Sequence, residues 1–221
     1  ATVNALDADY SDASGLRASG QLFYSDIDQD ANLANDATAI DGQDFGGWTK
    51  ISYAPDDRND LTLQLFYYGD EFDMNDMGFL RRNDWFRQAL EYRRDTNVYA
   101  EDSMLLDSFW RVKPQSEQNH NGDFLRGGVE MQYFLRLRDT RELNFQAYIE
   151  TAHNNDDLIT RGNGVVKLEP HRSFYARYLS PRAADFNYAI TYVLERKGTD
   201  KFAHEFEFEP ELFATETVTL K

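Results

Sequence analysis

The sequence predicts an all-β chain, folded as an antiparallel transmembrane β-barrel of the outer-membrane type or as an incomplete part of a larger barrel. Apolar and polar residues alternate along most of the chain, as in strands whose side chains point to opposite faces. Short turns and long polar loops alternate between these stretches, and tyrosines recur near their ends. No segment has the periodicity of an amphipathic helix.

Composition narrows the classes of function. The 221 residues carry a formal charge of −16, which opposes a nucleic-acid partner because phosphate binding needs clustered Lys and Arg. Aromatic residues reach 14%, with 16 Phe and 13 Tyr. The chain has no cysteine, so a disulfide framework and thiolate chemistry are excluded. A run of about 18 apolar residues, as a transmembrane helix requires, is absent.

Residues 1–221 are expected to form a single barrel domain, in which 1–14 and 26–44 are acidic loop segments. The chain begins with a polar, acidic stretch that does not resemble a signal peptide, and it has no initiator Met. It ends in "ETVTLK", which has the pattern of a strand still running. We therefore expect these residues to be part of a longer polypeptide.

The clearest strand is predicted at 124–138, "FLRGGVEMQYFLRLR". Its apolar positions include Val129, Met131 and Tyr133, and the intervening positions are mostly charged or polar. Residues 142–151 repeat the pattern, and the three-residue link 139–141 predicts a hairpin.

The remaining strands are predicted by the same rule. The alternation is clear at 16–24, 61–68 and 186–194, and weaker at 47–54, 84–93, 105–113, 173–179, 201–209 and 212–220. The total is eleven or twelve strands of roughly 8–15 residues. Short links are expected at 55–60, 138–142 and 180–185, and long loops at 26–44, 114–123 and 153–163, rich in turn-forming residues.

The polar side of these strands is expected to face a barrel lumen. It carries a ladder of charges formed by Arg87, Glu91, Arg93, Arg126, Glu130, Arg136, Arg138, Glu142 and Glu150. Tyrosines at the ends of the apolar side suit an interfacial girdle: Tyr24, Tyr53, Tyr67, Tyr92, Tyr133, Tyr178 and Tyr192. The alternative is a soluble β-sandwich or solenoid, but strands there are usually about 5–6 residues long.

The stretch 72–85, "FDMNDMGFLRRNDW", combines aromatic residues with adjacent arginines. We expect a loop at 69–78 and a strand at 79–93, with Arg81, Arg87, Glu91 and Arg93 facing the lumen. The stretch resembles a motif in a family of bacterial envelope proteins of unassigned function. Its matching residues are Phe72, Asn75, Asp76, Gly78, Phe79, Leu80, Arg82 and Asp84.

Members of that family pair an N-terminal domain similar to family-9 carbohydrate-binding domains with a large C-terminal β-barrel domain. The resemblance therefore implies an outer-membrane barrel with a connection to glycans. It brings no catalytic residues, because the family has none established. The layout is also similar to the barrels of TonB-dependent receptors, although no plug-like domain is found.

Residues 26–36, "DIDQDANLAND", place Asp26, Asp28, Asp30 and Asn32 at alternate positions, as at the start of a calcium loop. Ala31 and Ala37 stand where an EF-hand needs Gly and Glu, so an EF-hand is excluded. The alternatives are an acidic surface loop and a loose Ca²⁺ site, which could bridge lipopolysaccharide. The four histidines lack the spacing of a metal site, and no other cofactor is expected.

Enzymatic motifs are scarce. Glu205, Glu207 and Glu209 alternate with phenylalanines and share one strand face, which favours a carboxylate ladder over a glycosidase pair. No nucleophile elbow, phosphate loop or dinucleotide fingerprint occurs. The three tryptophans, Trp48, Trp85 and Trp110, are interpreted as an interfacial belt in preference to sugar-stacking platforms.

The predicted function is passage or binding of a solute, including a glycan by the resemblance, by an integral porin-like protein in the outer membrane of a Gram-negative bacterium. Its partners would be outer-membrane lipid, lipopolysaccharide and carbohydrate. The alternatives are a barrel-embedded hydrolase, a surface scaffold for another envelope protein and a soluble all-β carbohydrate-binding protein.

Overall fold

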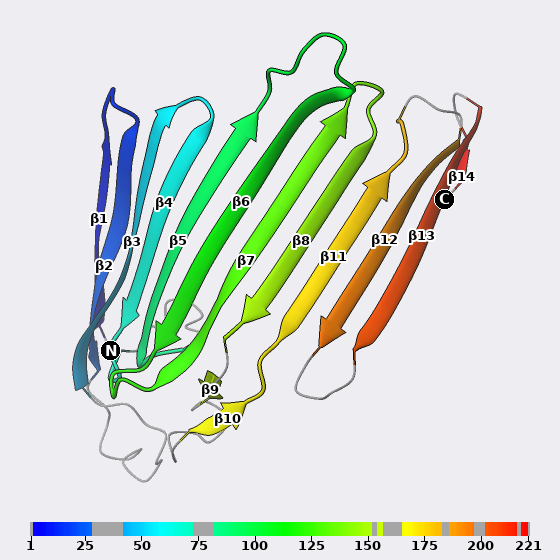
Figure 1. Cartoon of the computed structure of the whole chain (residues 1–221). Coiled ribbons are helices and arrows are strands. Elements are labelled where there is room, and N and C mark those ends of the chain that lie inside the picture. Colours follow the sequence, from blue (N-terminus) through cyan, green and yellow to red (C-terminus); the bar gives the residue numbers. More distant parts are fainter. Residues whose placement is uncertain are drawn as a thin grey trace.

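The computed structural model describes residues 2–27, 42–72, 82–151, 154–156, 165–182, 186–196, 202–215 and 218–220. Twelve of its strands form one antiparallel sheet, and β9 (Asn154–Asp156) and β10 (Val166–Leu168) form a separate pair (Figure 1). In the described residues there is no helix, and hence none long and apolar enough to cross a membrane. The predicted all-β antiparallel class is confirmed.

The strands of the large sheet follow one another in sequence order. They are β1 (Thr2–Ser11), β2 (Leu16–Ile27), β3 (Gly42–Asp56), β4 (Asn59–Tyr68), β5 (Trp85–Thr96), β6 (Leu105–Gln118), β7 (Phe124–Leu137), β8 (Glu142–Glu150), β11 (Arg172–Leu179), β12 (Phe186–Arg196), β13 (Ala203–Thr215) and β14 (Val218–Leu220). Within the described residues β1 pairs with β2 alone and β14 with β13 alone, so the sheet is open.

Every strand runs against its neighbours, so the connections gather at two ends of the sheet (Figure 1). The end that holds the β1–β2 and β3–β4 turns is called the turn end, and the opposite one the loop end. The three longest connections, 28–41, 69–84 and 151–171, all belong to the loop end, where the sequence predicts long loops at 26–44 and 153–163. The long loop predicted at 114–123 is wrong, because that connection is only 119–123, and the connection 197–202 at the same end is also short.

Several predicted boundaries are wrong. Residues 1–14 are not a loop, because Thr2–Ser11 forms β1, where acidic residues occupy one side and Leu6, Ala8 and Tyr10 the other. Residues 114–118 belong to β6, which carries Pro114 in the strand opposite Val129. The strand expected from 84 begins at Trp85, and residues 79–81 lie outside the described part.

The register gives the sheet one apolar face and one polar face. Directly paired residues share a face, so each row across the strands lies on one side of the sheet. One apolar row consists of Leu16, Tyr53, Leu61, Tyr92, Val112, Met131, Ala147, Phe174, Leu194 and His204. One polar row consists of Asp7, Gln21, Trp48, Phe66, Arg87, Glu117 and Arg126. The two-residue period predicted from the sequence is therefore confirmed.

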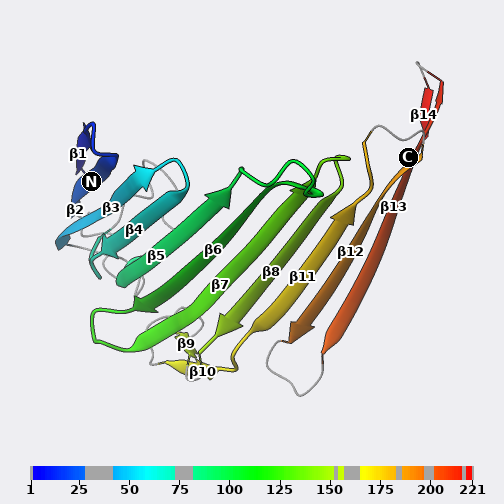
Figure 2. The same ribbon diagram turned by 45° about the horizontal axis from the view of Figure 1, so that its top comes forward.

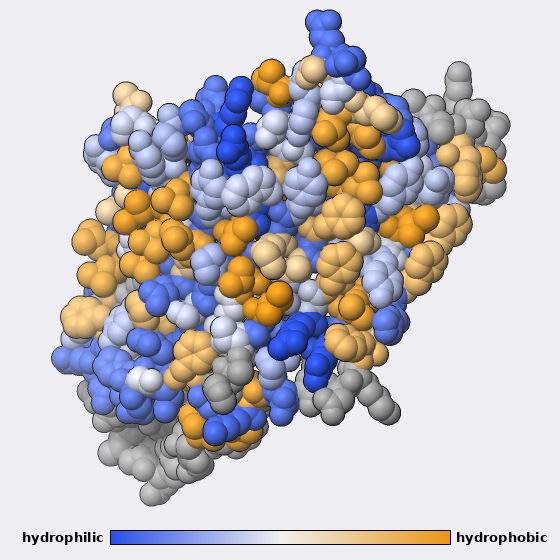
Figure 3. All heavy atoms as spheres, in the orientation of Figure 1, coloured by the Kyte–Doolittle hydropathy of each residue, from blue (hydrophilic) through white to orange (hydrophobic). Residues whose placement is uncertain are grey.

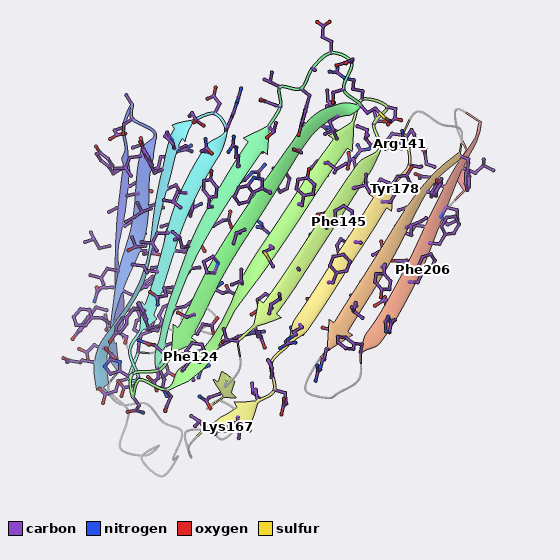
Figure 4. The ribbon with its side chains drawn as sticks, viewed as in Figure 1. Phe124, Arg141, Phe145, Lys167, Tyr178 and Phe206 are labelled. Atoms are coloured by element: carbon purple, nitrogen blue, oxygen red, sulfur yellow. The ribbon has the colours of Figure 1, made fainter. Side chains whose placement is uncertain are left out.

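The apolar face is the more exposed of the two. Leu22, Phe208 and Phe206 expose 52%, 51% and 69% of their surface, whereas the buried apolar residues of the described chain are Phe72, Ala89, Leu125 and Ala189. Figure 3 shows apolar side chains in a belt across the strands and hydrophilic ones toward both ends, and Phe145, Tyr178 and Phe206 mark this face in Figure 4. Its charged strand residues, Asp26, Asp56, Arg94, Arg172 and Arg196, lie near strand ends. No second layer covers the face within the described residues.

The strands are staggered. The apolar row starts at Leu16, between five and six residues from the middle of β2 toward the turn end, and finishes at His204, five residues from the middle of β13 toward the loop end. The shift over nine strand-to-strand steps is therefore about 1.2 residues per step. With roughly 3.3 Å per residue and 4.8 Å between strands, this stagger corresponds to a tilt of about 40°. Closed barrels have tilts of roughly 35–45°.

The sheet is also curved, and Figure 2 shows β1 and β2 turned out of the plane of the middle strands. The polar face has the more enclosed side chains, such as Arg87 and Glu117, as the concave side of a curved sheet does, and a hollow lies on it along β1–β5. Side chains on a concave face converge and those on a convex face diverge. This curvature explains why charged side chains are more enclosed than apolar ones.

The hairpin turns are held by aspartates. Asp56 accepts hydrogen bonds from the backbone N–H groups of Arg58 and Asn59 at 2.8 and 2.9 Å, which lowers the pKa of its carboxyl. A lowered pKa means that the folded state prefers the carboxylate. Its stabilising contribution is present above the ordinary pKa of 3.8 and is lost as the pH falls below that value.

Two glycines with positive φ give the first prediction. Gly15 has φ +87°, and an added Cβ would lie 2.1 Å from the carbonyl oxygen of Ala54, whereas Gly122 has φ +81° and open space around it. We expect Gly122→Ala to lower the free energy of unfolding by about 1 kcal/mol, through backbone strain alone. Gly15→Ala should cost about 3 kcal/mol because strain and a backbone clash combine. Urea unfolding of the purified variants measures both, and equal losses would contradict the register around Ala54.

Candidate functional site on the polar face

The predicted charge ladder lies on the polar face with one exception. Eight of its nine residues share that face by register: Arg87, Glu91, Arg93, Arg126, Glu130, Arg136, Glu142 and Glu150. Arg138 lies just beyond β7 instead. Its guanidinium donates to the carbonyl oxygens of Ser103 and Ala100, at 2.8 and 3.3 Å, and so ties the β7–β8 turn to the β5–β6 connection.

Arg111 links the middle of the ladder, although the sequence did not single it out. Its guanidinium lies 3.6 Å from the Glu91 carboxylate on one side and pairs with Glu130 on the other. Nearer the loop end of the same two strands, Arg87 of β5 lies 3.7 Å from Glu117 of β6 and donates to Gln115 at 2.9 Å. Alternation indicates which face a residue occupies but not which residue it meets across strands, so these partners could not be read in advance.

Glu150 is the most enclosed carboxylate of the ladder, with 5% of its side chain exposed. It accepts hydrogen bonds from Arg126 Nε at 2.6 Å, from the Tyr148 hydroxyl at 3.3 Å and from the backbone N–H of His171 at 2.7 Å. His171 Nε2 in turn lies 2.9 Å from Glu195. The cluster therefore fastens the chain that precedes β11 to the loop end of β7, β8 and β12.

A hollow of about 710 Å³ opens on the polar face toward the turn end of β1–β5. Its polar lining carries both charges and hydroxyls: Asp9, Ser11, Arg17, Ser19, Lys50, Ser52, Asp60, Thr62, Gln64, Glu91, Arg93 and Asp95. Arg93 pairs with Asp95 at 2.7 Å and lies over the Phe109 ring. Among the described residues, Arg17 and Lys50 have no carboxylate within ion-pair distance, so their charges face the hollow unpaired.

Aromatic side chains adjoin the hollow on its loop-end side. Trp48 and Phe66 are direct cross-strand partners, and Trp85 lies close to Phe66 with a ring-centre distance of 6.0 Å. The indole N–H groups of Trp48 and Trp85 are directed to Gln21 and Glu117, at 3.3 and 3.2 Å. All three rings are half-buried. We call Trp48, Phe66 and Trp85 the aromatic strip.

The strip overturns part of the tryptophan interpretation. Trp110 lies on the apolar face, where its ring meets that of Tyr92 edge-on at 5.1 Å, as the predicted belt requires. Trp48 and Trp85 lie on the opposite, polar face and so cannot belong to such a belt. The alternation within β3 and β5 already places both tryptophans, in the sequence, on the same side as charged residues. The seven predicted girdle tyrosines all lie on the apolar face.

The stretch 72–85 is only partly described. Phe72 is fully buried and stacks on Tyr68, with 5.5 Å between ring centres, so the chain after β4 folds back onto the polar face. Asp84 has φ +48°, and its carboxylate accepts the backbone N–H of His120 at 2.6 Å. Arg82 is half-buried. The other motif residues, Asn75, Asp76, Gly78, Phe79 and Leu80, lie outside the described residues, as does Arg81.

The remaining candidates are the residues of the Ca²⁺ hypothesis and the three glutamates of β13. Asp26 lies at the end of β2, while Asp28, Asp30 and Asn32 of the Ca²⁺ hypothesis lie outside the described residues. In the described part of the chain, no three His, Asp or Glu side chains gather closely enough to hold a metal ion. Glu205, Glu207 and Glu209 share the polar face, as predicted, and Glu209 pairs with Arg177 at 3.0 Å.

Comparison with known proteins gives no relative: no family model, curated protein or solved structure matches the chain. The arrangement of its own side chains is therefore the basis for a functional assignment.

Glu150 gives the second prediction. We expect Glu150→Ala to lower the free energy of unfolding by about 2 kcal/mol, because it leaves Arg126, the Tyr148 hydroxyl and the His171 N–H without their acceptor. The matched control is Glu209→Ala, which removes an ion pair in which both side chains are more than one-third exposed and should cost less than about 1 kcal/mol. Urea unfolding of both variants checks the difference, and equal costs would contradict the enclosed state of Glu150.

Proposed function

We propose that the chain is an outer-membrane β-barrel, or the larger part of one, which holds its apolar face in lipid and its polar face toward a water-filled lumen. The lumen would pass or bind a solute. The motif at 72–85 agrees with this assignment through its resemblance to the barrel domains of envelope proteins. The assignment also makes membrane lipid and lipopolysaccharide the surroundings of the apolar face.

The observation that carries the proposal is the inverted exposure of the sheet. Apolar side chains along ten or more strands face outward, while Arg87 and Glu117 on the opposite face expose only 25% and 19% of their side chains. Water-soluble monomers rarely expose contiguous apolar patches beyond a few hundred Å², because uncovered apolar surface costs about 25 cal/mol per Å². A hydrocarbon environment removes that cost, and a lumen hydrates the charges.

The geometry of the strands agrees with closure. Strands that span a membrane at a tilt need about 9–11 residues, and most strands of the large sheet have 8–15. The tilt of about 40° lies within the range of closed barrels. The even number of alternating strands in the sheet makes β1 and β14 antiparallel, which is the direction that closure between them needs.

A charged substitution on the apolar face gives the third prediction. Met131 lies on the apolar face near the middle of β7, and its neighbour Gln132 lies on the polar face. We expect Met131→Arg to cost about 2–4 kcal/mol of folding free energy in a bilayer, because the charge enters lipid. The control Gln132→Arg should cost less than about 1 kcal/mol, since its charge enters the lumen.

The measurement is folding into lipid vesicles, followed by gel mobility without boiling. The folded wild-type protein should migrate faster when unboiled and resist protease, and Met131→Arg should shift the folding equilibrium away from this band. A wild-type protein that stays soluble without detergent and shows no mobility shift would overturn the proposal. So would a Met131→Arg variant that folds as well as Gln132→Arg.

The charge of the polar face gives the fourth prediction. Its strands carry sixteen carboxylates, Asp7, Asp9, Asp44, Asp60, Glu91, Asp95, Asp107, Glu117, Glu130, Glu142, Glu150, Glu195, Glu205, Glu207, Glu209 and Glu211. They carry nine bases, Arg17, Lys50, Arg87, Arg93, Arg111, Lys113, Arg126, Arg136 and Arg177. The excess of seven negative charges should make an open lumen select cations over anions.

Planar bilayers under a KCl gradient measure this preference. We expect discrete conductance steps and a reversal potential of the sign set by K⁺. Anion preference would contradict the assignment of faces. A heat-modifiable barrel without conductance would instead favour the surface-scaffold alternative. The ion pairs of Arg111, Arg126 and Arg136 across strands agree with that alternative, because they fill the polar face with fixed charges.

A further inference from the structure

We propose that the hollow of β1–β5 and the aromatic strip beside it form a binding site for a neutral saccharide. This inference deepens the proposed function and rests on it, because it names the class of solute that enters the lumen. Three features carry it: the half-buried rings of the aromatic strip beside the hollow, a nearly balanced set of charges in the hollow of which Arg17, Lys50 and Asp9 have no ion-pair partner among the described residues, and the size of the hollow.

The rings and the hollow are continuous. Trp48, Lys50 and Ser52 are successive polar-face positions of β3, so the Trp48 ring lies next to the side chains that line the hollow. Phe66, Gln64 and Thr62 follow the same order on the neighbouring β4. A ligand lying in the hollow would therefore meet the aromatic strip at its loop-end side.

Trp48 and Phe66 lie beside a group of aromatic rings on the polar face, in which Trp85 stacks on Tyr68 and Tyr68 on Phe72. Every strand of this sheet offers apolar positions on the other face, where Trp110 lies. Trp48 instead shares a row with Arg87 and Glu117, and its indole N–H is directed to Gln21 at 3.3 Å. That hydrogen bond orients the indole, and a fixed ring beside water is a surface for stacking.

Saccharides combine the two kinds of surface that this site presents. The C–H groups on one side of a pyranose ring form an apolar patch that stacks on an aromatic ring. The hydroxyl groups both donate and accept hydrogen bonds, so they suit a lining that mixes carboxylates, cations, hydroxyls and amides. A ligand pocket commonly joins apolar walls to a few well-placed polar groups in this way.

The charges of the hollow favour a neutral ligand. Asp9, Asp60, Glu91 and Asp95 are nearly balanced by Arg17, Lys50 and Arg93. A phosphorylated or nucleic-acid ligand would need a clear excess of cations, and a cationic peptide a clear excess of acids. Arg17, Lys50 and Asp9, which have no ion-pair partner among the described residues, can turn to a hydroxyl without breaking an existing pair. The volume of about 710 Å³ suits a short oligosaccharide.

Calorimetric titration of the full chain, folded in detergent micelles, tests the inference. The probes are maltotriose, cellotriose and triacetylchitotriose, each titrated to about 20 mM. We expect at least one of them to bind. Trp48→Ala should weaken that binding at least tenfold, whereas Trp110→Ala, the matched tryptophan on the apolar face, should change it less than twofold.

A second variant keeps the test valid if Trp48→Ala fails to fold. Lys50 is exposed, so Lys50→Met should fold normally and weaken saccharide binding about threefold. A heat-modifiable wild-type protein that binds none of the three saccharides would overturn the inference and leave the barrel standing. Equal effects of the Trp48 and Trp110 variants would overturn it as well. A chain that binds a saccharide but stays soluble and lacks heat-modifiability would support the site and overturn the barrel.

Discussion

The register between neighbouring strands is the constraint on which the rest of the structure depends. Side chains alternate along a strand with period two, so a slip of one residue in a hairpin would exchange the two faces of every strand beyond it. Met131 and Gln132 show the consequence, since a slip would bring the amide to the apolar face and the thioether into the charge ladder. Tight turns prevent this, and Asp12 and Asp56 fix two of them through backbone hydrogen bonds.

The ladder is what a correct register produces on the other face. Arg111 reaches one carboxylate on β5 and another on β7 because all three residues occupy polar-face positions in neighbouring strands. Enclosing charges costs desolvation energy, and their mutual attraction offsets this cost where hydrogen bonds are complete, as around Glu150. An open, hydrated sheet lowers the cost further. A misaligned strand would leave Glu150 or Arg111 without these partners, so the ladder favours the observed register.

The sequence predicted which face of the sheet a residue occupies better than it predicted where strands end and which residues meet across strands. Val129 and Ile149 could be assigned to one face because alternation is a local property of the chain. The first strand was missed because acidic residues beside Leu6 and Ala8 resemble a loop when composition is considered before parity. The extension of β6 through Pro114 was missed because proline usually marks a break. The partners of Arg111 depend on register, which no single strand encodes.

The two tryptophan environments show that residue type alone does not predict the role of an aromatic side chain, because the face of the sheet matters as well. Trp110 and Trp48 are the same residue type on neighbouring regions of one sheet, and composition alone places both in an interfacial belt. Parity places Trp48 on the polar face, in the row of Arg87 and Glu117 and directly opposite Phe66. Exposed apolar surface of a ring costs free energy in water, and a bound apolar group that covers the ring removes this cost. A ligand with an apolar side and many hydroxyls would cover the ring and satisfy Lys50 and Asp9 in the adjoining hollow at once, which an apolar ligand or a simple ion would not do.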